Sequence, residues 1–259
     1  MKYYLKEEFL HDNNAKNAGN KARNDVEEIV KREGYQSLVL SVDNWYEMGT
    51  LKAQLHKSKA IGQALNQLKQ GDELLIQFPM LHHSFFTTHH VKKAQKKGVK
   101  VNFIIHDLEA LRYINVENLP LKHKINIQIQ ESGLLGAADG IIAHNPIMKS
   151  VLVDKGIAAD KIVSLGIFDY LIPNFQEKTG FTKNQPIIVA GNLAQEKAGY
   201  LYSLPAEPAY NLYGVGFDES RALENENYFG SFLPDELPAA LEGGFGLVWD
   251  GDSAETCSG

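Results

Sequence analysis

Two pairs of polar residues, His106-Asp107 and His144-Asn145, directly follow apolar runs that have the pattern of buried strands. Ligands of α/β proteins bind at the carboxyl ends of parallel strands. A histidine or aspartate at such a position can act as a general base. A histidine there can equally serve only to hydrogen-bond a carbonyl group at the end of a strand. From the residues alone, both interpretations of His106 and His144 stay open.

Two further histidine pairs, His82-His83 and His89-His90, raise the question of a metal site. Zinc sites usually combine histidine with carboxylate or thiolate ligands at fixed spacing, and neighbouring side chains orient the imidazole rings. Adjacent histidines do not meet this requirement by themselves. We therefore expect surface histidines and no metal.

A turn that contains glycine, Gly19-Asn20-Lys21, opens a helical pattern. Backbone N–H groups and the helix dipole at such a place can hold a phosphate or a sugar hydroxyl. The same spacing also fits an ordinary helix cap. The sequence has neither a G-x-x-x-x-G-K-[ST] motif nor a G-x-G-x-x-G motif after a strand, which argues against kinases and typical dehydrogenases.

Strand-like apolar runs alternate with helical patterns along the chain, which is typical of parallel sheets flanked by helices. The first expected element is a helix with apolar positions from Ala18 to Val30, ending at Gly34. Asn145 and Pro146 are expected to cap and open a later helix that Gly156 closes. The expected strands lie near residues 37–42, 73–78, 101–105, 140–143, 186–190, 210–214 and 245–249, and further helices near 49–70, before Gly98, and from 125 to 136.

Proline, asparagine and glycine interrupt the chain around residues 168–183, which indicates a linker. We place an N-terminal Rossmann-like domain at 1–170, the linker at 171–184 and a second Rossmann-like domain at 185–259. The second domain offers too few strands to bury both faces of such a sheet, so we expect it to be incomplete.

The net charge of −6 is unevenly divided: residues 1–150 hold 20 Lys and Arg against 16 Asp and Glu, and residues 151–259 hold 6 against 16. The weakly basic first half fits anionic acceptors, a membrane surface or ordinary solvated helices. Without a concentrated basic stripe, we expect no nucleic-acid partner. A single cysteine, Cys257, and the lack of about 18 consecutive apolar residues favour a cytoplasmic protein.

Several stretches in order resemble bacterial β-1,6-galactofuranosyltransferases and the related glucosyltransferases that extend N-acetylglucosamine on serine-rich adhesins. The most specific of them is IHDLEALR at 105–112. The others are NAGNKARND at 17–25, QFP at 77–79, DGIIAHN at 139–145, LGIFDY at 165–170, AGNL at 190–193, GSFLPDELP at 230–238 and FGLVWDG at 245–251. Together they span nearly the whole chain.

The resemblance implies the GT-B architecture, with an N-terminal acceptor domain, a C-terminal donor domain and a UDP-sugar as donor substrate. It implies no metal and no other cofactor. His106 or Asp107 would supply a base if the reaction inverts the anomeric centre. The acceptor-binding residues would be Gly19, Asn20, His144 and Asn145. The nucleotide-sugar-binding residues would be Gly191, Asn192, Leu193, Lys197, Tyr213, Gly214, Trp249 and Asp250.

The resemblance therefore predicts transfer of galactofuranose or glucose to a glycan or glycoprotein acceptor. Members of the family continue beyond the WDG segment into an Asn-Pro-His-Lys-like stretch, whereas this chain ends at Gly259, so we expect weak donor binding. One alternative is an inactive subunit that binds acceptor or stabilises a partner. Another is a metal-dependent transferase that uses the D-x-D pair Asp250 and Asp252. Peripheral membrane contact and self-association also stay open.

Overall fold

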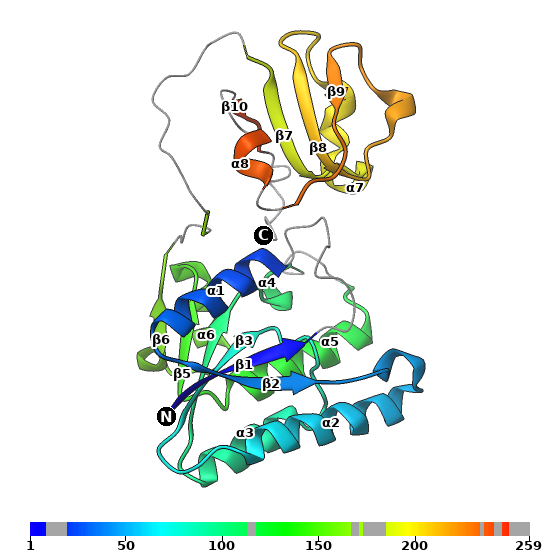
Figure 1. Ribbon diagram of the computed structural model, residues 1–259. Coiled ribbons are helices and arrows are strands. Elements are labelled where there is room, and N and C mark those ends of the chain that lie inside the picture. The colour runs from blue at the N-terminus through cyan, green and yellow to red at the C-terminus, as the bar shows by residue number, and fades with distance from the viewer. Residues whose placement is uncertain are drawn as a thin grey trace. The chain divides into compact units, whose positions relative to one another are not determined.

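The computed structural model of the chain describes residues 1–8, 20–112, 118–166, 171–172, 185–233, 236–240 and 245–248. These residues form two compact units, and each unit has its own parallel sheet and its own apolar core (Figure 1). The predicted α/β class with two parallel sheets is therefore confirmed. No helix within the described ranges is long and apolar enough to cross a membrane.

The first unit is built on a six-stranded parallel sheet in the order β2-β1-β3-β4-β5-β6. Its strands are β1 (Lys2–Glu8), β2 (Gln36–Ser41), β3 (Glu73–Phe78), β4 (Lys100–Ile105), β5 (Gly140–Ala143) and β6 (Ile162–Ser164). The chain runs from β1 to β2 on one side and then crosses back to β3 on the other side. The carboxyl ends of β1 and β3 therefore flank a topological switch point, which is where open α/β sheets bind ligands.

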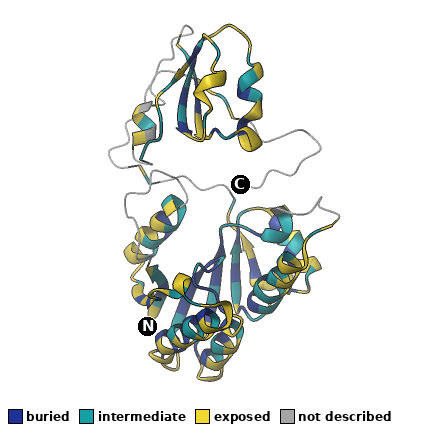
Figure 2. Cartoon of the chain, turned by 90° about the vertical axis from the view of Figure 1, so that its right-hand side faces the viewer, coloured by how far each residue is buried: buried dark blue, intermediate teal, exposed yellow. Residues whose placement is uncertain are grey.

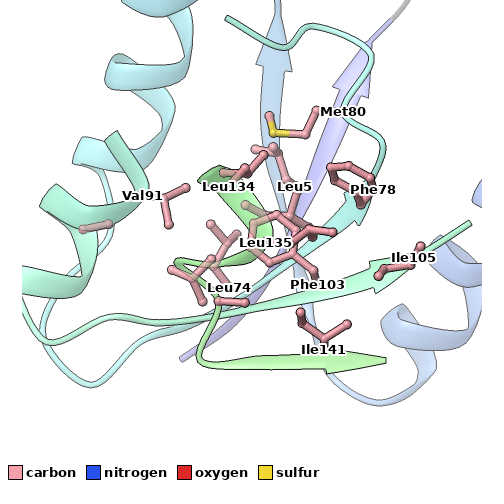
Figure 3. Packing of buried hydrophobic residues seen from close by; sticks show 14 of the residues in the cluster. Leu5, Leu74, Phe78, Met80, Val91, Phe103, Ile105, Leu134, Leu135 and Ile141 are labelled. Atoms are coloured by element: carbon pink, nitrogen blue, oxygen red, sulfur yellow. The ribbon is translucent and has the colours of Figure 1, made fainter. Parts of the chain in front are cut away.

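Helices cover both faces of this sheet: α1 (Lys21–Arg32), α2 (Thr50–Asn66), α3 (Thr87–Lys96), α4 (Glu109–Arg112), α5 (Leu121–Ile127) and α6 (Pro146–Asp154), with the short 3₁₀ segments η2 (Trp45–Glu47) and η4 (Ala159–Lys161). Tyr4 packs with Val26 of α1 on one face. The neighbouring Leu5 packs on the other face in the larger core cluster, which Figure 3 shows. This alternation is the period of two expected of a strand.

Strand β1 was not predicted from the sequence, because charged residues interrupt its apolar run. Its partners are β2 on one side and β3 on the other, so it lies inside the sheet. Tyr4 and Leu5 are buried on opposite faces. A strand buried on both faces has no simple polar and apolar alternation to recognise.

The helical spacing predicted between residues 125 and 136 is confirmed, but most of this stretch is a π-helix. Segment η3 (Gln128–Leu135) continues α5 with the wider π geometry, which is rare and frequent at functional sites. At its end, a Cβ atom on Gly136 would lie 2.4 Å from the carbonyl oxygen of Ser132. Only glycine fits at this close approach.

The second unit is smaller and has a four-stranded parallel sheet in the order β10-β7-β8-β9. Its strands are β7 (Ile187–Asn192), β8 (Tyr210–Val215), β9 (Glu226–Tyr228) and β10 (Phe245–Gly246). The helical segments are α7 (Gln195–Ala198), η5 (Gly199–Ser203), η6 (Glu219–Arg221) and α8 (Leu237–Ala240). Figure 2 shows that buried residues follow the strands of each sheet.

Candidate functional site

The carboxyl edge of the first sheet holds a buried ion pair at the switch point. Glu7, at the end of β1, accepts hydrogen bonds from the backbone N–H groups of Leu81 at 3.0 Å and His82 at 2.7 Å. The Nη1 atom of Arg23 on α1 lies 3.9 Å from Glu7 Oε2. Burial raises the pKa of Glu7, and these hydrogen bonds and the Arg23 charge act against that rise. The pair ties α1 and the loop after β3 to the central strand.

A chain of hydrogen bonds at this edge determines the protonation of His106. Gln77 Nε2 donates to the carbonyl oxygen of Arg23 at 3.3 Å, so Gln77 Oε1 faces His106 Nε2 at 2.7 Å. An amide oxygen can only accept. We therefore assign the proton to His106 Nε2, and Nδ1 is left as the acceptor of the ring.

Both histidines of the predicted site are uncharged at neutral pH. Burial, followed by the charges of Arg23 and His144, lowers the pKa of His106 to about 4. Burial also lowers the pKa of His144, while a hydrogen bond to the carbonyl of Ile105 raises it. The two rings lie 6.4 Å apart, so the structure brings His106 at the end of β4 and His144 at the end of β5 close together.

Asn145 has the structural role that its position predicts. Its Oδ1 accepts a hydrogen bond from the N–H of Met148 at 2.8 Å and caps α6, which Pro146 opens. Of the other proposed acceptor-binding residues, Asn20 is exposed just before α1, and Gly19 lies outside the described residues.

A cavity of about 170 Å³, which we call the edge cavity, opens beside Asp107 at the ends of β3 and β4. Its lining residues are Phe78, Pro79, Asp107, Glu109, Asn126, Gln130 and Glu131. Asp107 therefore lines the cavity, whereas His106 points to Gln77. Of the two predicted catalytic residues, Asp107 is the one that lines this cavity.

In the second unit, five of the predicted nucleotide-sugar residues lie at the ends of two neighbouring strands: Gly191, Asn192 and Leu193 at the end of β7, and Tyr213 and Gly214 at the end of β8. Gly191 pairs with Gly214 in the parallel register, and a Cβ on Gly214 would lie only 1.8 Å from the carbonyl oxygen of Gly191. Leu193 is buried, and its N–H donates to Val215 at 2.8 Å. Asn192 Oδ1 accepts from the N–H of Ala194 at 3.0 Å. The backbones of β7 and β8 thus lie too close together at Gly214 to admit a side chain there.

An aromatic group and two cations surround this turn. The ring of Tyr213 stacks on Phe229 at 4.9 Å between centroids. Lys197 is exposed on α7. Arg221 Nη1 donates at 2.8 Å to Oε1 of Gln195, which lies on α7 with Lys197. The Arg221 guanidinium lies 3.9 Å from the ring centroid of Tyr202. Lys197 and Arg221 are the only Lys or Arg residues after residue 184.

The prediction of surface histidines is wrong for one pair. His82 and His83 are buried, with exposures of 3% and 9%, whereas His89 is exposed and His90 half-buried. His82 Nε2 bonds at 2.9 Å to the carbonyl of Glu8, the last residue of β1, which is the strand that was not predicted from the sequence. Within the described ranges, no three His, Cys, Asp or Glu residues are grouped as metal ligands. Trp249, Asp250 and Asp252 lie outside those ranges.

Two family models together match most of the chain. "Glucosyltransferase 3-like, N-terminal domain" matches residues 2–167, and "Glucosyltransferase 3-like, C-terminal domain" matches residues 187–259. The chain belongs to the glucosyltransferase 3-like family. A similar protein is the β-1,6-galactofuranosyltransferase WbbI of Escherichia coli K12. It is 32% identical over an aligned length of 263 residues, and the alignment covers 97% of this chain and 70% of that protein. The chain is a hexosyltransferase of the GT-B class.

Solved structures support the fold. The lipopolysaccharide outer core galactosyltransferase WaaB aligns with a TM-score of 0.54 at 12% identity, over 93% of this chain and 71% of that chain. The UDP complex of Staphylococcus aureus MnaA gives 0.54 at 11% identity, over 97% and 74%. A UDP-N-acetylglucosamine 2-epimerase of Neisseria meningitidis gives 0.53 at 11%, over 94% and 76%. Because transferases and epimerases share this fold, the family membership identifies the activity and the fold does not.

Several residues at the carboxyl edges of the two sheets were not recognised from the sequence. Glu7, Arg23 and Gln77 meet only because β1, α1 and β3 come together in the fold. Gln130 belongs to the π-helix, and Arg221 ends the 3₁₀ segment η6 after β8. Arg23 and Gln77 do occur in the stretches NAGNKARND and QFP that carry the family resemblance. That resemblance was the one sequence feature that could have marked them as functional.

Proposed function

We propose that this glycosyltransferase moves galactofuranose or glucose from a UDP-sugar to a hydroxyl group of a surface glycan or glycoprotein. The observation that carries the proposal is the 32% identity to a β-1,6-galactofuranosyltransferase over 97% of the chain. The matched family model is described as glucosyltransferase 3-like, which keeps glucose as the second donor. The choice between these two sugars is part of the proposal.

For the donor, we assign the carboxyl ends of β7 and β8 to the UDP moiety. The leaving diphosphate carries negative charge, and a transferase without a metal stabilises that charge with cationic side chains and backbone N–H groups. In support, Lys197 and Arg221 are the only cations after residue 184, and both lie at α7. The N–H groups of Leu193 and Ala194 are already used within the turn. Lys197 is therefore the principal candidate partner of the diphosphate, with Tyr213 and Gly214 beside the nucleotide.

For the acceptor, we assign the carboxyl edge of the first sheet. If the anomeric centre inverts, a base must take the proton of the attacking hydroxyl. Asp107 lines the edge cavity and is our candidate for that base. With its pKa lowered to about 4, His106 is a weak base that stays neutral, and we assign it to orient groups at the site. His144 and Asn145 would then border the acceptor at the end of β5.

Contact with an anionic membrane surface is a further part of the proposal. Leu51 and Leu55 on α2 are 70% and 53% exposed, and Leu121 and Ile125 on α5 are 72% and 45% exposed. Exposed lysines alternate with them on both helices, a combination typical of interfacial helices. Co-sedimentation with phosphatidylglycerol vesicles tests the contact, and sedimentation velocity tests self-association through the same side chains. A cytoplasmic location is proposed from the single cysteine.

The test is UDP release by the purified full chain from UDP-galactofuranose or UDP-glucose with methyl glycosides as acceptors. Asp107→Asn removes the proposed base and should lower kcat by about 100-fold or more, with the affinity for UDP unchanged. Asp43→Asn, at an exposed position after β2, is the control and should keep full activity. The alternative, an inactive subunit, predicts acceptor binding without UDP release in every variant.

A further inference from the structure

Helices α2 and α3 lie side by side on one face of the first sheet, and α1 covers the other face (Figure 1). Two hydrogen bonds join this pair of elements. Ser58 Oγ lies 2.9 Å from His90 Nε2, and Ser84 Oγ, just before α3, donates at 3.0 Å to the carbonyl oxygen of Gln54. The solvent-facing sides of the two helices therefore form one surface, which we call the α2–α3 face.

Four large apolar side chains are exposed together at one end of this face, and we call them the apolar tip. Leu51 and Leu55, one turn apart on α2, are 70% and 53% exposed, and Phe85 and Phe86, at the start of α3, are 50% and 43% exposed. The N–H of Phe85 donates at 3.0 Å to Oε1 of Gln54, which lies between the two leucines in the chain. Exposed apolar groups gathered in this way mark a surface that meets a membrane or another protein.

The charged residues of both helices are all positive. Together α2 and α3 contain six lysines and no Asp or Glu. Lys57 is buried, and its ammonium group lies 3.3 Å from the ring centroid of Trp45. The five exposed lysines are Lys52, Lys59, Lys92, Lys93 and Lys96. Glu47, just before α2, is the nearest exposed acid along the chain, so the face keeps an excess of positive charge that attracts an anionic surface.

Helix α5 also exposes two apolar side chains, but acidic residues border it. Glu109 Oε1 lies 2.7 Å from Nδ1 of His123, and Glu109 Oε2 accepts from Nδ2 of Asn126 at 2.6 Å. Asp107 and Glu131 line the edge cavity together with Asn126. These carboxylates weaken the attraction of α5 to an anionic surface. Charge therefore distinguishes the two apolar regions and favours the α2–α3 face.

We propose that the α2–α3 face docks on an anionic lipid bilayer, with the apolar tip in the interfacial region and the five exposed lysines against the lipid headgroups. Exposed Phe and Leu beside Lys are the combination found in interfacial helices. The inference rests on the membrane contact of the proposed function and assigns that contact to one surface. Since α2 follows β2 and Phe85 follows β3, the tip lies at the carboxyl side of the first sheet. Docking would bring the edge that we assign to the acceptor close to the bilayer.

Co-sedimentation of the full chain with lipid vesicles tests the face. Vesicles of phosphatidylglycerol and phosphatidylcholine in equal parts should bind the protein, and vesicles of phosphatidylcholine alone should bind it at least about 10-fold more weakly. Lys59→Gln with Lys92→Gln should weaken binding to the anionic vesicles by about 10- to 30-fold, and the difference should shrink at high salt. Phe85→Ser with Phe86→Ser should weaken it by about 10-fold or more, because two half-exposed rings no longer enter the bilayer.

The matched control is Leu121→Ser with Ile125→Ser, which removes exposed apolar side chains from α5 and should leave vesicle binding unchanged. Loss of binding in this control, with both α2–α3 variants unaffected, would overturn the assignment. Equal binding to neutral and anionic vesicles would overturn the charge argument. Sedimentation velocity tests a second copy of the chain as the occupant. If the phenylalanine variant loses self-association and keeps vesicle binding, the face is an interface between copies and the proposal fails.

UDP release separates this inference from the proposed transfer. A wild type that releases UDP but does not sediment with anionic vesicles keeps the function and overturns the docking face. A wild type that sediments through the α2–α3 face but releases no UDP from either sugar keeps the face and contradicts the function. Should the phenylalanine variant not fold, as judged by circular dichroism, the lysine variant decides, because it changes only exposed side chains.

Discussion

Replacement of Gln77 by glutamate gives the sharpest test of the His106 environment. The substitution keeps the size of the side chain and places a carboxylate where Gln77 Oε1 now lies, 2.7 Å from His106 Nε2. A negative charge there stabilises the protonated imidazole. The pKa of His106, now lowered to about 4 by burial and by Arg23, must therefore rise.

The size of this rise follows from the distance. At 2.7 Å, Coulomb's law with an effective dielectric constant of about 20 gives an upper limit near 6 kcal/mol. Opposite charges in proteins shift a pKa by about 1–3 units, so the expected pKa of His106 in the variant is about 5–7. The carboxylate also faces the carbonyl oxygen of Arg23 and loses a donated hydrogen bond. We expect that loss to lower the free energy of unfolding by about 1–3 kcal/mol.

The assay is an NMR titration of the His106 ring protons in the full chain from pH 3.5 to 8. Gln77→Met is the matched control, because it removes both hydrogen bonds without adding a charge and should leave the pKa of His106 near its low value. Equal midpoints for Gln77→Glu and Gln77→Met would refute the hydrogen-bond chain. A wild-type midpoint near 6.5 would refute the burial argument itself.

Three further predictions concern stability and donor binding. The pKa values of His83 and His106 are lowered by burial to about 4, so between about pH 6.5 and 4 the unfolded state binds their protons first and stability falls as the pH falls. Each histidine contributes up to about 3 kcal/mol to this loss, and urea unfolding of His83→Gln and His106→Gln should show a weaker pH dependence. Gly214→Ala should lower the free energy of unfolding of the second unit by at least about 3 kcal/mol, because its Cβ would overlap the carbonyl oxygen of Gly191 on β7. The control Gly246→Ala, in the same sheet, should change that free energy little, because its Cβ would meet no atom within 4 Å. Calorimetry should show that Lys197→Met binds UDP about 10-fold more weakly at low salt, with a smaller difference at 1 M salt, and equal affinities at low salt would exclude Lys197 from the diphosphate site.

Much of the fold could be predicted because its elements have strong local signals. Strands β3 and β5 begin and end at the predicted residues 73–78 and 140–143. The Asn145 cap and Pro146 at the start of α6 are confirmed. Gly34 follows α1 with a φ of 83°, the left-handed value for which glycine was expected there. Each of these features depends on a few neighbouring residues, which a sequence displays directly.

The parts that were missed depend on contacts between distant residues. Glu7 can be buried only because the loop after β3 supplies two N–H groups and α1 supplies Arg23. His82 contacts the same strand β1 through the carbonyl of Glu8. Because β1 was not recognised, His82 and His83 were wrongly predicted to lie on the surface. The hydrogen bonds from Gln130 to Asn126 and from Asn126 to Glu109 join η3, α5 and α4. Periodicity carries no information about any of these partnerships.

The central claim is hexosyl transfer from a UDP-sugar, and product mass tests it most directly. The purified full chain is incubated with UDP-galactofuranose or UDP-glucose and methyl β-glucopyranoside, and products are measured by mass spectrometry together with released UDP. We predict an acceptor heavier by one hexose, in equal amount to the UDP released, and product formation slower by about 100-fold or more with Asp107→Asn. A folded protein that binds neither nucleotide sugar, or that releases UDP without any glycosylated product, would contradict the account.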